Sequence, residues 1–159
     1  MTSSFRPVVA LAALCAVLFL AAGPRPSFAE TSAGLRVGLG IDPDQVLVGG
    51  QVNLDALSEH VYIVPSAEAG FGDDAFTLSF NGDVQYRFDV QGSVRPYAGG
   101  GLTLFYYDLD EGRGDDTELG VAVLGGIFFG RAEGNPMFVE AKAGIGDIPE
   151  WKIMFGINF

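Results

Sequence analysis

Apolar residues alternate with polar or small residues along most of the chain from Gly34 onward. Side chains of a β-strand alternate between two faces, so such a pattern places all the apolar side chains of a strand on one side. The stretch 151–159 shows this most plainly, with apolar residues at every second position: Trp151, Ile153, Phe155, Ile157 and Phe159. No segment after Gly34 has a convincing helical period, and the pattern therefore predicts an all-β protein.

The alternation divides the chain into eight predicted strands. They lie at about 34–41, 46–54, 61–71, 75–88, 94–106, 117–130, 137–146 and 151–159. The connections between them are short and rich in Gly, Pro, Asp and Asn, the residues that turns require. Short connections join antiparallel neighbours, so we expect an antiparallel meander. The connection 55–60 is the one in which we expect room for a helical turn.

Each predicted strand has one face without charge, and nearly all charges within strands fall on the opposite face. In the fourth strand, for example, Phe76 and Leu78 alternate with Thr77 and Ser79. Two closed geometries use this pattern. A soluble barrel turns its apolar face inward, whereas a transmembrane barrel turns it toward lipid and keeps a polar interior.

The composition of the polar face favours the transmembrane barrel. This face is rich in Gly, Ser, Thr, Asn and Gln, and its charges are of both signs, as a narrow filled lumen requires. Charges inside a small barrel must pair, because an unpaired one is strongly desolvated. We therefore predict a lumen ion network, with Lys152 paired to Glu140 of the neighbouring strand. Its predicted members are Arg36, Glu68, Asp83, Arg87, Arg95, Glu118, Glu140, Lys142 and Lys152.

The first residues of the chain predict export from the cytoplasm. Arg6 provides a short basic region, 7–23 is uncharged and apolar, and small residues at 27–29 resemble a cleavage site. We predict a cleaved signal peptide at 1–29 and one barrel domain at 30–159. The single cysteine, Cys15, lies in the signal peptide, so disulfides and cysteine chemistry are excluded for the mature domain.

The charge of the predicted mature chain is strongly negative. Without Arg6 and Arg25 it has seven basic and twenty acidic residues, a net charge of about −13. Nucleic-acid binding needs a basic footprint, so we exclude nucleic acid as a partner. The many Val, Leu, Ile and Phe residues likewise argue against intrinsic disorder.

A signal peptide together with a final strand ending in phenylalanine resembles the small eight-stranded outer-membrane β-barrels of the OmpA/OmpX type. The segment 95–102, Arg-Pro-Tyr-Ala-Gly-Gly-Gly-Leu, is similar to a Pro-Tyr-x-Gly-x-Gly strand common among them. The resemblance implies an eight-stranded antiparallel up-and-down transmembrane barrel in the outer membrane of a Gram-negative-type bacterium. It also implies that the alternating residues of 151–159, with Phe159 at their end, form a signal read by the barrel assembly machinery. The connections after the first, second and seventh strands are very short, which weakens any analogy with long-loop functions such as receptor binding.

An even number of strands with both termini in the periplasm would place four acidic connections outside the cell. They contain 11 acidic residues: Asp42, Asp44, Asp73, Asp74, Asp108, Asp110, Glu111, Asp115, Asp116, Asp147 and Glu150. Exposed acidic tips keep a barrel soluble and unaggregated, which is the simpler interpretation. The alternative is a Ca²⁺ or Mg²⁺ site at Asp108, Asp110, Asp115 and Asp116, which could bridge the rim to lipopolysaccharide phosphates. The spacing of these carboxylates does not match an EF-hand.

The sequence contains no recognisable active site. His60 is the sole histidine, and it lies in a predicted turn with no serine partner in evidence. We expect the interior carboxylates to pair with cations, and no cofactor is expected apart from a possible cation at the acidic rim. The predicted function is therefore that of a monomer, surrounded by lipid and lipopolysaccharide and folded by the barrel assembly machinery, with a structural or surface-interaction role and no catalysis. The alternatives are a soluble periplasmic barrel that binds a small apolar ligand and a narrow-pore, porin-like channel.

Overall fold

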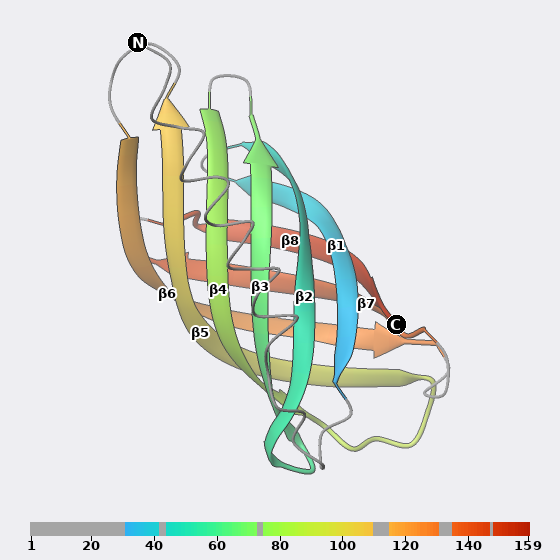
Figure 1. Cartoon of the computed structure of the whole chain (residues 1–159). Helices are drawn as coiled ribbons and strands as arrows, with labels where there is room; N and C mark the ends of the chain where they lie inside the picture. The colour runs from blue at the N-terminus through green and yellow to red at the C-terminus, as the bar shows by residue number, and fades with distance from the viewer. Residues whose placement is uncertain (1–30, 42–43, 73–74, 110–114, 131–134, 147) are drawn as a thin grey trace.

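The computed structural model of the chain describes residues 31–41, 44–72, 75–109, 115–130, 135–146 and 148–159 (Figure 1). Within these ranges, residues 55–57, 75, 107–109 and 115–116 are described by their backbone alone. The predicted signal peptide lies outside the described residues. No described segment forms a helix long and apolar enough to cross a membrane.

Eight strands follow one another along the chain. They are β1 (Ser32–Ile41), β2 (Gln45–Ser58), β3 (Val61–Phe71), β4 (Ala75–Arg87), β5 (Val94–Leu109), β6 (Asp115–Phe129), β7 (Met137–Ile145) and β8 (Trp151–Asn158). Each strand pairs antiparallel with the next, and β8 pairs with β1, so the sheet closes into a barrel in strand order. Closure leaves no strand edge unpaired. The predicted eight-stranded antiparallel barrel is confirmed.

The predicted strand positions are correct, and most differences are a few residues at strand ends. The larger difference is at 55–60, where we expected room for a helical turn. Instead β2 continues to Ser58, with an irregularity in its pairing with β3 between Asp55 and Ser58. Strand pairing with Tyr62 and Val61 satisfies the backbone there, so the turn shortens to residues 59 and 60.

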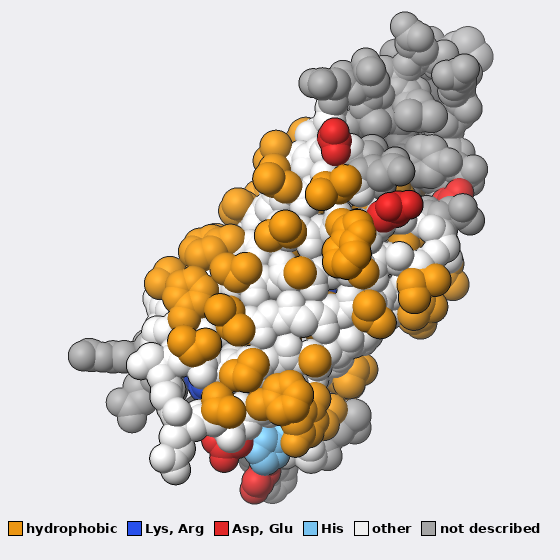
Figure 2. All heavy atoms as spheres, turned by 180° about the vertical axis from the view of Figure 1, so that it is seen from behind, with side chains coloured by type: hydrophobic (Ala, Val, Ile, Leu, Met, Phe, Trp, Pro, Cys, Tyr) orange, Lys and Arg blue, Asp and Glu red, His pale blue; other side chains and the backbone are white. Residues whose placement is uncertain are grey.

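The barrel wall is apolar on the outside. Large hydrophobic side chains such as Leu35, Val121 and Ile153 are at least half exposed, whereas the charged Arg36, Asp83 and Glu140 are at most 1% exposed. Figure 2 shows hydrophobic side chains spread over one side of this wall. This arrangement is the reverse of a soluble barrel, and the interpretation that turned the apolar face inward is therefore wrong.

The two ends of the barrel differ in what they carry. We call the end with the β1–β2, β3–β4, β5–β6 and β7–β8 connections the loop end. The terminal end is the opposite one, where β1 begins and β8 finishes, and it also carries the turns at 59–60 and 88–93.

Candidate functional site

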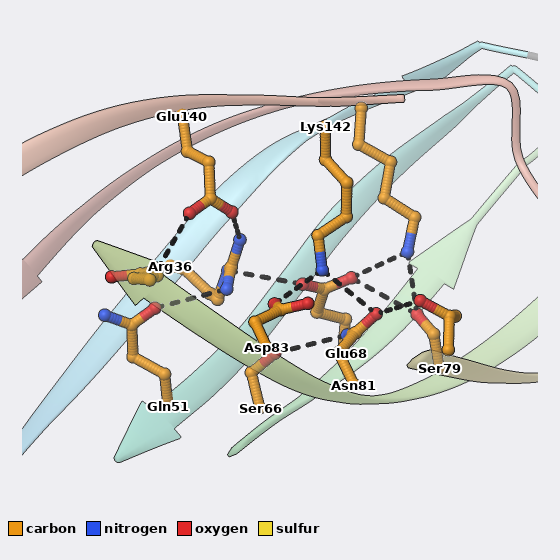
Figure 3. Close-up of polar contacts among 12 residues, drawn as sticks. Arg36, Gln51, Ser66, Glu68, Ser79, Asn81, Asp83, Glu140 and Lys142 are labelled. Atoms are coloured by element: carbon orange, nitrogen blue, oxygen red, sulfur yellow. Dashed lines mark hydrogen bonds and ion pairs between the residues drawn. The ribbon is translucent and has the colours of Figure 1, made fainter. Parts of the chain in front are cut away.

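Six charged side chains meet in the middle of the lumen, and each is at most 3% exposed. They come from five strands, because every second residue of a strand points inward. The six are Arg36, Glu68, Asp83, Glu140, Lys142 and Lys152. Three are cations and three are anions, so the cluster, which we call the lumen ion cluster, is neutral. Figure 3 shows how its side chains converge from opposite walls.

Arg36 on β1 joins two carboxylates. Its Nη2 lies 2.7 Å from Glu140 Oε1, and its Nε lies 3.2 Å from Glu68 Oε1. The third contact of the guanidinium goes to an amide, since Nη1 donates to Gln51 Oε1 at 3.1 Å. A planar fork with several donors suits this bridging role, which a lysine could not fill in the same way.

Lys152 on β8 crosses the lumen to Glu68 on β3. Its Nζ lies 2.9 Å from Glu68 Oε2 and 3.1 Å from Ser79 Oγ, and the Ser79 hydroxyl also donates to Glu68. The predicted partner of Lys152 is Glu140, and this prediction is wrong. Glu140 instead faces Arg36, because contacts across a narrow lumen are as short as those between neighbouring strands.

Lys142 and Asp83 form the third part of the cluster. Lys142 Nζ donates to Asp83 Oδ2 at 2.6 Å and to Asn81 Oδ1 at 3.4 Å. Asn81 Oδ1 also accepts from the Thr103 hydroxyl, and its amide donates to Ser66. Neutral polar side chains thus complete the hydrogen bonding around the ions, which a buried charge requires.

Glu140 receives three hydrogen bonds. Besides Arg36, the Tyr97 hydroxyl donates to Oε2 at 2.9 Å and Gln85 Nε2 donates to the same oxygen at 3.3 Å. The period-two alternation places Tyr97 and Gln85 on the polar face, but it predicts no contact with Glu140 for either residue. The alternating pattern was the available signal for these residues, because it identifies which side chains point into the lumen. It does not identify their positions along the barrel axis, on which contact with Glu140 depends.

Three predicted members of the network stand apart from the lumen ion cluster. Arg87, Arg95 and Glu118 take part in none of the ion pairs found among the described residues. The Arg87 guanidinium carbon lies 3.7 Å from the centre of the Tyr62 ring and 4.6 Å from that of Phe128. Arg95 and Glu118 are partly exposed near opposite ends of the barrel.

Apolar side chains lie in the lumen on both sides of the polar layer. Toward the terminal end, Tyr97, Leu124, Phe128 and Phe138 form one buried cluster. Toward the loop end, Phe105, Ala122 and Ile148 form another. Glycines make room for them: a side chain at Gly126 would overlap the Tyr97 ring, and one at Gly120 would lie 2.7 Å from Ile148. Eight strands enclose only enough space for side chains, and both apolar clusters lie within that space together with the lumen ion cluster.

This architecture is similar to that of several solved structures. The N-terminal β-barrel domain of Pseudomonas aeruginosa OprF matches with a TM-score of 0.67 and 18% identity, covering 81% of this chain and 96% of that one. Neisserial surface protein A matches with a TM-score of 0.57 and 16% identity, covering 80% of this chain and 90% of that one. The chain has the fold of a small outer-membrane β-barrel.

Other comparisons limit what this likeness means. The de novo designed TMB2.3 matches with a TM-score of 0.55 and 16% identity, covering 86% of this chain and 97% of that one. A designed barrel resembles this chain nearly as closely as Neisserial surface protein A does, so the likeness concerns the fold and not a function. No family model matches the chain. No curated protein matches it either.

The remaining predicted site residues of this outer-membrane barrel fold are described only in part. Asp110 is outside the described residues, and Asp108, Asp115 and Asp116 are described by their backbone alone, so the predicted cation site stays a prediction. The side chains that the structure describes include no cluster suited to a metal ion. His60 lies at the terminal end, where its ring stacks on that of Tyr86 with 5.9 Å between the ring centres.

The predicted assembly signal lies on the outer wall. Trp151, Ile153 and Phe155 point outward from β8 and are about half exposed. The other face of β8 carries Lys152 and Met154, which are buried in the lumen. The strand therefore has one face for the surroundings of the barrel and one for its interior.

Proposed function

We propose that the protein resides in the outer membrane as a closed, non-conducting β-barrel with a structural or surface-interaction role. The observation that carries this proposal is the inverted polarity of the molecule. An apolar wall surrounds a neutral, paired ion cluster, and apolar side chains fill the lumen on either side of it. Such a molecule is suited to reside in a lipid bilayer and to expose the connections between its strands at the membrane surface, and it offers no path for solute.

The outer wall supports residence in a bilayer. Every Lys and Arg whose side chain the structure describes points into the lumen or lies at its mouth, so the described wall offers lipid no positive charge. Aromatic pairs lie near strand ends, such as Phe71 with Phe76 and Tyr86 with Phe88, where interfacial girdles occur in membrane barrels. The proposal includes a monomer, because closed hydrogen bonding leaves no strand edge to recruit a second copy.

A non-catalytic role is part of the proposal. Glu68 and Glu140 each contact a cation at 3.2 Å or less, and Asp83 contacts Lys142 at 2.6 Å. Carboxylates held in this way stabilise the barrel and are poorly placed to exchange protons with a substrate. His60 stacks on Tyr86 at one end, far along the barrel from the loop-end connections.

The acidic connections belong to the proposal as the part of the barrel that meets the cell exterior. Asp44 and Glu150, on the β1–β2 and β7–β8 connections, are exposed at the loop end. If the loop end faces outward, these acids lie near lipopolysaccharide phosphates and need divalent cations between them. Added Mg²⁺ should then tighten association with lipopolysaccharide, and chelation should loosen it.

Two measurements test the proposal. Mature protein should require detergent and should migrate faster on an unheated gel than after boiling; full solubility without detergent would refute residence in a membrane. In planar bilayers we expect no single-channel current. Stable conductance steps would identify a channel and overturn the closed-lumen proposal if they also persist in the Lys142→Met variant. Such steps would not depend on the ion pair of Lys142 and Asp83.

A further inference from the structure

Arg87, the last residue of β4, is fixed at the terminal end of the lumen without a carboxylate partner among the described side chains. Its guanidinium lies between the rings of Tyr62 and Phe128, at 3.7 and 4.6 Å. Its Nη2 donates to Asn53 Oδ1 at 2.5 Å and to Gln85 Oε1 at 3.3 Å. Amide oxygens and aromatic faces thus orient this charge, but no described group neutralises it.

A second arginine stands next to it. Arg87 pairs with Tyr97 in the β4–β5 ladder, and Arg95 lies two residues before Tyr97 on the same face of β5. Diagonal positions of this kind place Cα atoms about 7–8 Å apart, within reach of two long side chains. Arg95 also pairs directly with Phe128 in the β5–β6 ladder, and Phe128 is the ring against which Arg87 rests. Arg95 takes part in no ion pair within the described part of the chain.

Arg87 and Arg95 differ from the charged residues of the lumen ion cluster, all of which are paired with an opposite charge. In the lumen ion cluster, three cations face three anions, and every member has an opposite charge within 3.2 Å. At the terminal end, two like charges share one small mouth, in a protein whose acidic residues outnumber its basic ones by more than two to one. Neighbouring like charges that are partly desolvated favour the binding of an opposite charge.

We propose that the terminal-end mouth of the lumen binds a phosphate-type oxyanion between Arg87 and Arg95. Guanidinium groups recognise such anions through parallel N–H donors, and a donor plane already fixed by two rings loses little freedom on binding. Nε of Arg87 is buried and has no hydrogen-bond partner within the described structure. Asn53 and Gln85 both accept from Nη2, so Nε–H is a donor of this guanidinium that they leave free.

The anion could be free phosphate or the phosphate of a lipid head group, and the experiment separates the two. Folded protein is prepared in octyl glucoside, which has no phosphate, and thermal unfolding is followed with increasing pyrophosphate or with sodium chloride of matched ionic strength. We expect pyrophosphate to raise the unfolding temperature more than chloride does, because a ligand bound only by the folded state stabilises it. A second arm adds short-chain phosphatidylglycerol, and a larger rise there identifies the lipid as the source.

Variants assign the effect to the two arginines. Arg87→Lys keeps the charge but loses the fork, and we expect its affinity for pyrophosphate to fall about tenfold. The double variant Arg87→Gln and Arg95→Gln should lose the response. If it fails to fold, Arg95→Gln alone, at a partly exposed position, should still weaken binding measurably.

Three outcomes would overturn the proposal. One is a pyrophosphate effect no larger than that of chloride, which would mean general screening. Another is an unchanged response in Arg95→Gln and Arg87→Lys. Asp55 pairs with Tyr62 in the ladder, so Asp55→Asn serves as a charge control. Pyrophosphate binding that appears only in Asp55→Asn would show that this acid already neutralises the site, and the proposal would fall.

Discussion

Lys142 on β7 and Lys152 on β8 are direct partners across the ladder, yet they extend to different carboxylates. Lys142 reaches Asp83 at 2.6 Å, and Lys152 reaches Glu68 at 2.9 Å. Like charges placed opposite each other normally destabilise a sheet. Here the side chains of both lysines extend across the lumen, so the repulsion is offset by two ion pairs with carboxylates on the opposite wall. The pair ties the β7–β8 hairpin to β3 and β4.

Glu68 holds two of these cations, so its removal should be costly. Glu68→Gln would leave Arg36 and Lys152 with one carboxylate fewer in a buried layer. Breaking a buried ion pair on one side typically costs about 3–5 kcal/mol. We expect the free energy of unfolding in detergent, measured by urea titration, to fall by an amount in that range.

Glu118→Gln is the matched control for this loss. Glu118 is a partly exposed glutamate that belongs to none of the ion pairs of the described residues, and the same atoms are exchanged. Its unfolding free energy should change by at most about 0.5 kcal/mol, as for most surface substitutions. Equal losses in both variants would show that the cluster contributes no specific stability.

The pair of Asp83 and Lys142 permits a test of what the stability of the barrel depends on. Either the two charges themselves stabilise it, or it requires only that neither charge is left unpaired. Asp83→Asn alone leaves the Lys142 ammonium, which is 3% exposed, without its counter-ion. Adding Lys142→Met removes the stranded charge as well, and replacing both members of a buried pair is often neutral or stabilising. We therefore expect the double variant to unfold at higher urea than Asp83→Asn. A double variant less stable than the single one would contradict this view.

The fold and the lumen differ in how far the sequence predicts them. Period-two alternation located all eight strands, and it placed Arg36, Glu68 and Glu140 on one face, because side-chain direction in a strand is a local property. It did not pair Lys152 with Glu68. That contact depends on the relative heights of β8 and β3 across the barrel, which follow from the stagger of every ladder between them.

Two apolar features of the lumen could not be predicted from the sequence either. Ile148 lies in a connection that we expected to face outward, yet it is 7% exposed and contacts Phe105 and Ala122. A single apolar residue in a short polar connection gives no periodic signal. Similarly, Arg87 was expected to pair with a carboxylate because it is a charge on the polar face. Its aromatic partners Tyr62 and Phe128 come from other strands, and their proximity is a tertiary property.

Two glycines with opposite surroundings allow a test of lumen packing. Gly126 faces inward beneath the Tyr97 ring, with no room for a methyl group, whereas Gly82 faces outward with nothing within 4 Å of an added Cβ. Overpacking a filled core typically costs about 1–3 kcal/mol. We expect Gly126→Ala to lower the unfolding free energy by that amount and Gly82→Ala to be neutral or slightly stabilising. If the two substitutions behaved alike, the lumen would have to be looser than these contacts indicate.

The depth of the outer wall in lipid can be measured with a charge placed on it. Leu102, near the middle of β5, is 56% exposed, and Val94, the first residue of the same strand, is 49% exposed. An arginine on the lipid face of a membrane barrel costs about 2–4 kcal/mol at the bilayer midplane and about 0–1 kcal/mol near the interface. Leu102→Arg should therefore destabilise the protein in phospholipid vesicles by several times as much as Val94→Arg, as measured by guanidinium unfolding. A soluble environment would make the two costs similar, because water solvates an arginine equally well at either position. The ratio of the two losses thus reports directly whether hydrocarbon surrounds the middle of this wall.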